Sequence, residues 1–277
     1  MVSRFAICVA AVLCASSAAL AQTSPVLPLA SHRAAYDISL ADSSSPTPSA
    51  AQTPVSATGL IAYEFRGSAC EGYTSNFRQM TEMERSEGEP VSMQVNAMSF
   101  EEASGKSMRF QIDSEGLQDN PPVAGTATRG ADDNMRVVLT KPKTQTLDFG
   151  HEVLFPTQHI ERLIEAAKHG GGPIQARVYD GSDTGKKVFA TLTVIGKEAT
   201  RPGPDAATAE ALSKMRRWPV SVSYFDESSK DAPPEYVLSF DLYENGVSGT
   251  LKLDYGAFVL TAKLTKLEWL PTHTCAK

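Results

Sequence analysis

The dominant pattern along this chain is an alternation of apolar and polar residues with a period of two. Because successive side chains of a strand point to opposite faces, the alternation predicts strands with one buried face, typical of antiparallel sheets. Such runs cover 36–40, 61–65, 73–77, 108–112, 174–178, 220–224, 236–242, 251–255 and 258–264. The pattern predicts an all-β fold with about 12–14 mostly antiparallel strands, in an open barrel or a rolled sheet.

The turns between these runs are recognisable from their residue types. Asn245-Gly246 separates two alternating runs and is a strong hairpin signal, because both residues tolerate the left-handed backbone of a tight turn. The segment 180–187, DGSDTGKK, predicts a polar hairpin loop between two further strands. Most strands are therefore expected to pair with their neighbours in sequence.

Two changes of phase interrupt the alternation. In the last run the apolar positions are even-numbered up to Leu264 and odd-numbered afterwards, which predicts a β-bulge near Thr265-Lys266. A similar slip is expected between Ala97 and Met98, where the apolar positions change in the opposite sense, from odd-numbered to even-numbered. Bulges bend strands, as a rolled sheet requires.

One segment has helical rather than strand periodicity. Within 155–170, Thr157 is the expected N-cap and Gly170 the expected stop. One apolar stripe follows from the spacing of Ile160, Leu163, Ile164 and Ala167. This helix is expected to cover a barrel mouth or to plug the barrel, and a weaker, short helix is expected within 205–217.

The chain begins with a segment typical of export signals. Arg4 precedes an apolar stretch, and Ala19-Leu20-Ala21 fits the small-x-small cleavage rule, so residues 1–21 are expected to be a cleaved signal peptide. Residues 22–277 are expected to form a single domain with a flexible Pro/Ser-rich loop at 42–58. No later segment approaches the length of a membrane span. The sequence thus predicts an exported protein without an integral membrane span.

The charge of the chain limits the classes of partner. Lysine and arginine number 26 against 32 aspartates and glutamates, which gives a net charge of −6. Nucleic acids and anionic lipid surfaces require a basic surface. We therefore expect neither as a main partner, and we expect a monomer.

The cysteines indicate a covalent constraint. Cys8 and Cys14 lie within the expected signal peptide, which leaves Cys70 and Cys275 for an oxidising compartment. Two such thiols most simply form a disulfide. A zinc or redox site is not supported because no Cys-x-x-Cys motif is present. A nucleophilic cysteine is the alternative that the residues leave open.

No catalytic or cofactor motif is found in the sequence. There is no Gly-x-Ser-x-Gly elbow, and the only glycine run, 170–172, follows a helix instead of preceding one. His159, in the first helical turn, is a weak candidate for proton transfer, and Asp180 with Asp183 is a weak candidate for calcium binding. We therefore predict no catalytic residues, no metal site and no cofactor, and the sequence leaves any ligand-binding residues unknown.

Four aromatic residues are candidates for the lining of an apolar cavity, although ordinary core packing explains each of them more simply. These residues are Phe155, Tyr224, Phe225 and Tyr243.

Several long segments resemble one known family. YEFRGSACEGYTSNFRQMTE (63–82), FPTQHIERLIEAA (155–167), RRWPVSVSYFD (216–226) and DLYENGVSGTLKLDYGAFVLTAKLTKLEWLP (241–271) are similar to the EipB cell-envelope integrity family of alphaproteobacteria. The resemblance implies a periplasmic protein folded as a many-stranded β-spiral, an open barrel-like sheet. It also implies a disulfide between Cys70 and Cys275, and no known catalytic residues.

These observations lead to three functional hypotheses. The first is a non-enzymatic periplasmic protein that supports cell-envelope integrity by binding an envelope protein or another envelope component. The alternative is a carrier that holds a lipid or other apolar molecule inside an open barrel. The least favoured is a hydrolase of peptidoglycan or another glycan.

Overall fold

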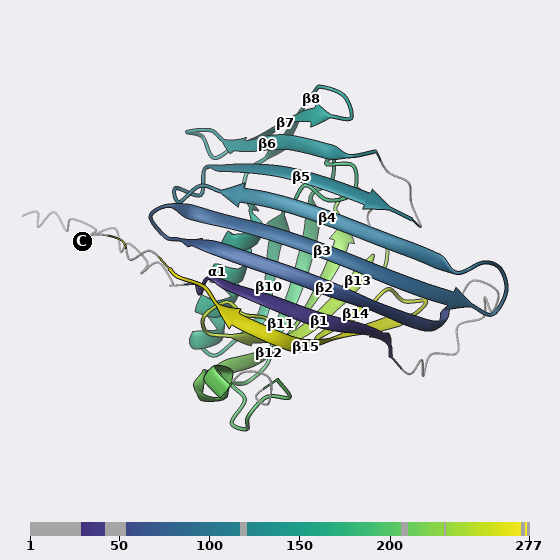
Figure 1. The fold of residues 1–277 in the computed structure, drawn as a ribbon. Coiled ribbons are helices and arrows are strands. Elements are labelled where there is room, and N and C mark those ends of the chain that lie inside the picture. Colours follow the sequence, from purple (N-terminus) through teal and green to yellow (C-terminus); the bar gives the residue numbers. More distant parts are fainter. Residues whose placement is uncertain are drawn as a thin grey trace, which may run out of the picture.

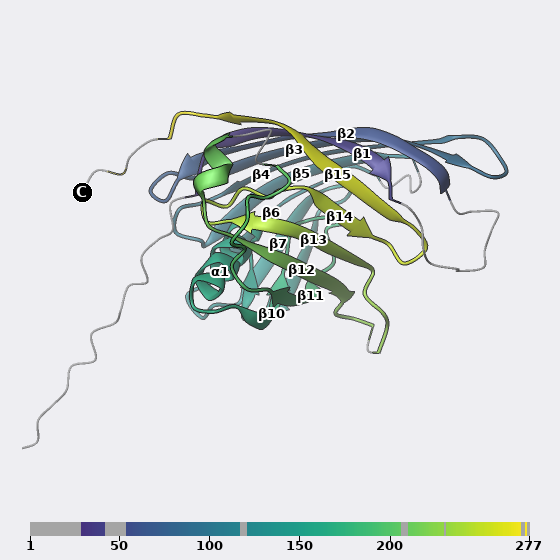
Figure 2. The same cartoon turned by 90° about the horizontal axis from the view of Figure 1, so that it is seen from below.

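The computed structural model describes residues 29–41, 54–116, 121–205, 210–229, 231–272 and 275. Their strands form one 15-stranded sheet that rolls around an interior (Figures 1 and 2). The strands are β1 His32–Leu40, β2 Pro54–Ser68, β3 Gly72–Arg85, β4 Val91–Glu101, β5 Ser107–Glu115, β6 Val123–Arg129, β7 Met135–Lys141, β8 Gln145–Gly150, β9 Val153–Leu154, β10 Gly172–Val178, β11 Phe189–Ile195, β12 Arg217–Asp226, β13 Tyr236–Tyr243, β14 Leu251–Asp254 and β15 Val259–Trp269. The predicted all-β class is confirmed; the count exceeds the predicted range of about 12–14 because a two-residue strand such as β9 leaves no alternation to detect.

The order of strands in the sheet follows the chain, with one closure. It runs from β8 down to β1, continues to β15 and then runs down to β9. Every pair is antiparallel except β9 with β10, which are parallel and joined through the helix α1, Pro156–Lys168. The first and last strands pair along their length, so the two ends of the domain lie side by side in the middle of the sheet.

One of the two predicted irregularities is present. In the β1–β15 pair Tyr36 faces Leu264 and Ala35 faces Lys266, so Thr265 is the extra residue of a bulge, as predicted. The expected slip between Ala97 and Met98 is wrong. Strand β4 pairs with β3 and with β5 without interruption through this point, and Met98 is 57% exposed.

Helix α1 lies between the two layers of the rolled sheet at one end of the barrel (Figure 2). Its N-cap is Phe155, with Pro156 in the first helical position, so the expected cap at Thr157 is wrong by two residues. The Thr157 hydroxyl donates instead to Glu101. The apolar stripe packs into the end of the barrel against Trp218 and the other core residues there, as the helical pattern predicted.

Two other expectations change in extent. The flexible loop expected at 42–58 ends earlier, because β2 begins at Pro54 and Ala57 is buried in the core; residues 42–53 lie outside the described residues, as does the expected signal peptide. The helix expected within 205–217 is, among the described residues, only a 3₁₀ turn at Glu210–Lys214.

A disulfide joins Cys70, in the turn between β2 and β3, to Cys275 near the end of the chain. The Cα atoms are 5.8 Å apart and the two residues are separated by 205 positions. The bond ties the C-terminal segment to the same end of the barrel that α1 fills, because β2 ends and β3 begins there.

Candidate ligand-binding cavity

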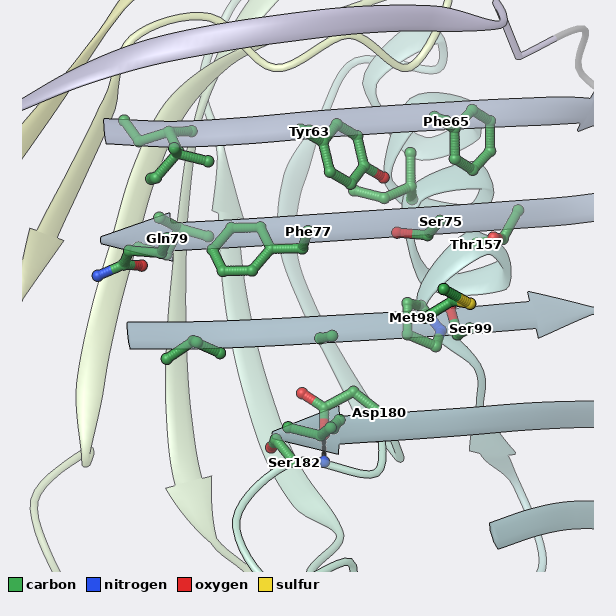
Figure 3. A pocket seen from close by; sticks show the side chains of 18 of the residues that line it. Tyr63, Phe65, Ser75, Phe77, Gln79, Met98, Ser99, Thr157, Asp180 and Ser182 are labelled. Atoms are coloured by element: carbon green, nitrogen blue, oxygen red, sulfur yellow. Dashed lines mark hydrogen bonds between the residues drawn. The ribbon is translucent and has the colours of Figure 1, made fainter. Parts of the chain in front are cut away.

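The interior of the rolled sheet contains a cavity of about 560 Å³ (Figure 3). Strands β2 to β5 form one wall, β13 and β14 form the facing wall, and the first turn of α1 forms one end. The lining residues are Leu29, His32, Ile61, Tyr63, Phe65, Ser75, Phe77, Gln79, Val95, Ala97, Met98, Ser99, Glu101, Phe110, Ile112, Pro156, Thr157, Ile160, Asp180, Ser182, Tyr236, Leu238, Asn245, Gly246, Leu251, Leu253 and Tyr255. A volume of this size lies within the range of about 300–1,000 Å³ that is typical of small-molecule sites.

The cavity exists because inward-facing apolar side chains do not meet across the barrel. Phe77 and Ala97 are neighbouring Cα partners on β3 and β4, in one wall. Leu238 and Leu253 are neighbouring Cα partners on β13 and β14, in the facing wall. All four line the cavity and are only half-buried. Wide barrels commonly leave such a space, since side chains on opposite walls are too short to fill it.

One wall of the cavity carries stacked aromatic rings. Tyr236 stacks on Tyr224 with ring centroids 4.5 Å apart, and Tyr255 follows at 6.1 Å from Tyr236. Burial raises the pKa of Tyr236 well above its usual value. Tyr255 is 37% exposed, which places it at the mouth of the cavity.

The end of the cavity next to α1 is polar. Ser75 and Ser99 are Cα partners on β3 and β4, and Glu101 follows two residues later on the same face. Glu101 is 5% exposed and accepts hydrogen bonds from the Thr157 backbone N–H at 3.0 Å and from its hydroxyl at 2.9 Å. Burial raises the pKa of Glu101 to about 7, with a smaller contribution from the negative charge of Glu161. We call Ser75, Ser99, Glu101 and Thr157 the polar floor.

A second acidic group enters the cavity from the connection between β10 and β11. Asp180 accepts a hydrogen bond from the Ser182 backbone N–H at 2.8 Å, and burial raises the pKa of its carboxyl (Figure 3). Gly181, with φ of 77°, lies against Phe110; an added Cβ would lie 2.4 Å from that ring. The predicted hairpin is present, but it folds into the barrel instead of forming a surface loop.

The charges in the cavity are unbalanced. The described residues that line it include the acids Glu101 and Asp180 and contain no lysine or arginine. His32 is the only histidine among them, and burial lowers the pKa of its imidazole, so it is neutral at pH 7. The Nδ1 atom of His32 lies 2.8 Å from the Ala30 carbonyl oxygen.

The four aromatic residues that the sequence offered as candidates for a cavity lining do not line this cavity, and the simpler explanation of core packing holds for Phe155 and Tyr243. Phe155 and Tyr243 are fully buried in packed cores, Tyr224 lies behind Tyr236, and Phe225 lines a separate depression beside Arg177. The aromatic side chains that do line the cavity lie in the alternating runs that the sequence showed clearly. They are Tyr63, Phe65, Phe77, Phe110, Tyr236 and Tyr255. The sequence did not reveal which of the inward residues remain uncovered.

The weak catalytic and metal candidates are dispersed. His159 is buried on α1 outside the cavity lining, and burial lowers the pKa of its imidazole to about 4. Asp183 forms an ion pair of 3.3 Å with Lys187, while Asp180 points into the cavity. Within the described ranges no group of three or more His, Cys, Asp or Glu residues could hold a metal ion.

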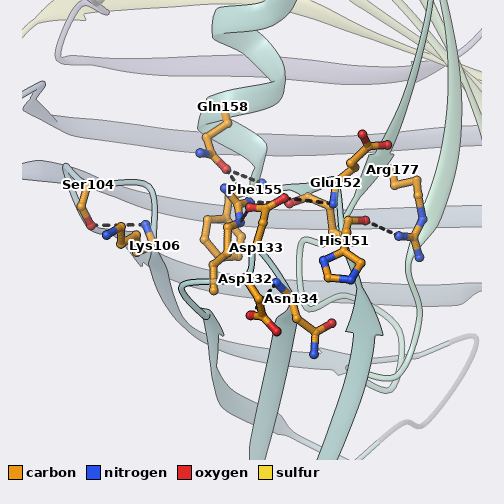
Figure 4. A network of polar contacts seen from close by, with 12 residues as sticks. Ser104, Lys106, Asp132, Asp133, Asn134, His151, Glu152, Phe155, Gln158 and Arg177 are labelled. Atoms are coloured by element: carbon orange, nitrogen blue, oxygen red, sulfur yellow. Dashed lines mark hydrogen bonds and ion pairs between the residues drawn. The ribbon is translucent and has the colours of Figure 1, made fainter. Parts of the chain in front are cut away.

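A second polar network joins the two edges of the sheet (Figure 4). Strands β8 and β9 are these edges and follow each other in the chain, so the barrel comes close to closing at residues 150–153. Arg177 donates to the carbonyl oxygens of His151 at 2.6 Å and Phe149 at 2.9 Å, and Arg129 donates to that of Val153 at 2.5 Å. The network therefore replaces the missing backbone pairing, which is a structural role.

Comparison with known proteins agrees with this architecture. The sequence model of a family described as EipB-like matches residues 23–271. The chain belongs to the EipB-like family. The EipB-like chain is 37% identical over 261 residues to the "Cell envelope integrity protein EipB" of Brucella abortus, covering 92% of this chain and 89% of that protein.

A solved structure confirms the fold of this EipB-like chain. It is the crystal structure of a beta-barrel-like protein of a domain of unknown function from Brucella abortus, matched with a TM-score of 0.80 and 35% identity. The match covers 88% of this chain and all of the solved one. Among the described residues, no helix has the length and apolar content needed to cross a membrane.

Proposed function

We propose that this EipB-like protein acts in the periplasm, where it supports the integrity of the cell envelope by holding an apolar or amphiphilic envelope component in its cavity. The observation that carries the proposal is the cavity of about 560 Å³, in which Phe77, Ala97, Leu238 and Leu253 are left half-buried. Burying those side chains against a ligand would gain about 25 cal/mol per Å² of apolar surface. The name of the Brucella relative and the export signal expected at residues 1–21 support the envelope role.

Binding without catalysis fits the floor of the cavity better than hydrolysis does. A glycosidase needs two carboxyl groups that can reach the scissile bond, one as acid and one as base or nucleophile. Both oxygens of Glu101 lie within hydrogen-bond distance of the Thr157 backbone N–H, at 3.0 and 3.2 Å, so this carboxyl is held by the helix terminus. We therefore infer that Glu101 positions α1 and lines a binding site.

The proposal can be tested by filling the cavity. Ala97 lines it on β4, so Ala97→Leu should occupy part of the space, whereas Ala62→Leu adds the same atoms on the exposed face of β2. Fluorescence of the apolar probe 1-N-phenylnaphthylamine should rise with wild type and with Ala62→Leu. We expect Ala97→Leu to weaken probe binding at least tenfold.

Two further measurements connect this binding with the cell. Solvent extraction and native mass spectrometry of protein taken from the periplasm should recover a bound apolar compound from wild type and less from Ala97→Leu. In a strain that lacks the gene, Ala62→Leu should restore detergent resistance and Ala97→Leu should restore less. Equal probe binding by both variants, together with no recovered compound, would overturn the proposal.

A further inference from the structure

The cavity changes character along its length. From the mouth toward α1, the inward positions of β3 and β4 are the Cα partners Gln79 and Val95, then Phe77 and Ala97, then Ser75 and Ser99. Glu101 comes next and meets Thr157 of α1. The polar exception near the mouth, Gln79, donates its side-chain N–H to Thr81 at 3.1 Å. An amphiphile would therefore find apolar contacts near the mouth and hydrogen-bonding groups at the inner end.

The polar floor has the wrong charge for an anion. Among the residues that the structure describes, no lysine or arginine lines the cavity, and the lining residues Glu101 and Asp180 are both acidic. An anionic group buried there would lose its hydration without gaining a cation, which is strongly unfavourable. A hydroxyl or an ammonium group can instead donate hydrogen bonds to the carboxyl and hydroxyl oxygens of the floor.

The helix terminus does not reverse this preference. The first turn of a helix presents free N–H groups and a partial positive charge that attract anions. In this protein the Glu101 carboxyl already takes that position, since it accepts from the Thr157 backbone N–H and hydroxyl. The Phe155 N–H, at the N-cap, donates to Gln158 at 3.1 Å. The protein thus fills its own anion site.

We propose that the cavity selects single-chain amphiphiles whose polar group is uncharged or cationic and donates hydrogen bonds, with that group seated on the polar floor and the chain directed toward the mouth. This inference rests on the proposed function and specifies the chemical class of its ligand. Anionic amphiphiles such as fatty acids and phosphate monoesters are disfavoured by the same floor.

Three ligands with the same twelve-carbon chain separate the head groups. Dodecanol, dodecylammonium and dodecanoate would compete with 1-N-phenylnaphthylamine at pH 8, below the micelle concentrations of the two ionic ligands and below the solubility limit of dodecanol. We expect dodecanol and dodecylammonium to displace the probe at concentrations at least tenfold lower than dodecanoate, a ratio that corresponds to one well-made hydrogen bond or more. Equal displacement by dodecanoate would overturn the inference.

Two matched variants test whether the head group of the ligand binds at the polar floor. Glu101→Gln removes the charge of the floor but keeps an oxygen that can accept from Thr157, whereas Glu102→Gln makes the same change at the adjacent, exposed residue. We expect Glu101→Gln to lower the preference for dodecylammonium over dodecanoate by about tenfold, and Glu102→Gln to leave it unchanged. Unchanged selectivity in Glu101→Gln would contradict the placement.

The outcomes also separate this inference from the proposed function. Probe binding that Ala97→Leu abolishes, with no selectivity among the three ligands, would overturn the selection of head groups and leave the cavity as a binding site. Failure of the probe and of all three ligands to bind would overturn both.

Discussion

The two ends of the barrel share the alternation of apolar and polar residues, but they differ in how completely the inward side chains are buried. Around α1, inward side chains meet helix residues such as Leu163 and Ile164, which are 0% exposed. Toward the mouth, Phe77 and Leu238 point inward in the same way but remain half-buried around the cavity. The alternation along a strand therefore specifies which face of the strand turns inward. Whether the inward side chains are covered depends on contacts with other parts of the chain, such as α1.

This difference in packing between the α1 end and the cavity indicates where the protein gains stability and where it can bind a ligand. Fully buried leucines at the α1 end contribute the large free energies of a packed core. Half-buried residues at the cavity contribute less in the free protein, and that unused apolar surface is what a ligand can cover.

The largest effect is expected from the disulfide, which closes a separation of 205 positions at the packed end. The chain-entropy relation gives a stabilisation of about 5 kcal/mol as an upper value for such a loop. Cys70→Ser should therefore lower the melting temperature in oxidising buffer, and reductant should lower that of wild type but have little further effect on the variant. Identical melting of wild type with and without reductant would contradict this.

Leucine truncation compares the two regions directly. Leu163→Ala opens a void in the packed end and should lower the free energy of unfolding by about 4 kcal/mol. Leu238→Ala removes the same atoms beside an existing cavity and should cost about 1 kcal/mol, because fewer contacts are lost. Urea denaturation of both variants measures the contrast, and equal losses would mean that the cavity is not empty in solution.

Glu101 lies at the boundary between the two regions and should make stability depend on pH. Its carboxyl holds its proton up to about pH 7 when folded but loses it near pH 4.5 when unfolded. At this group the unfolded chain therefore binds fewer protons between these values, and the contribution of Glu101 to the free energy of unfolding should fall as the pH rises through this range, by on the order of 2–3 kcal/mol.

The variant Glu101→Gln isolates this contribution. It should match wild type near pH 4.5 and be more stable at pH 8, whereas Glu102→Gln should follow wild type throughout. Burial of His32 and His159 lowers their pKa values, so they reduce stability only as the pH falls below 6.5, and they do so equally in all variants. A wild-type advantage at pH 8 would show that the Glu101 charge is stabilising.

The smallest effect on stability is expected from enlarging a side chain at the cavity. Ala97→Leu points into empty space and should change the free energy of unfolding by less than about 1 kcal/mol. Ala167→Leu enlarges a residue of α1 that is 3% exposed and should cost about 1–3 kcal/mol through overpacking. Comparable losses at the two positions would contradict the contrast between the regions.

The site was missed in the sequence for an identifiable reason. The alternation through β4 continues in one phase from Val95 through Ala97 to Ser99 and Glu101. Because the last two are polar, and the neighbouring Met98 is apolar, the pattern suggested a slip of phase at that point. Polar residues at inward positions of an apolar face were the signal of the polar floor.

The inward path of the connection after β10 could not be predicted either. Asp180, Gly181 and Ser182 have the composition of a surface turn, and such residues commonly form one. The contact of Gly181 with Phe110 and the positions of Asp180 and Ser182 in the cavity lining show that this backbone passes along the inner wall. That contact joins residues far apart in the sequence, and no local pattern encodes it.

The sequence alone determined the strand class, the one apolar stripe of α1 and the bulge at Thr265, because each depends on the spacing of neighbouring residues along one element. The tertiary structure decided that α1 fills one end of the barrel while the middle stays hollow, and that Glu101 meets Thr157 across 56 positions. Whether an inward side chain finds a partner depends on the curvature of the whole sheet and on distant segments, which local periodicity does not record.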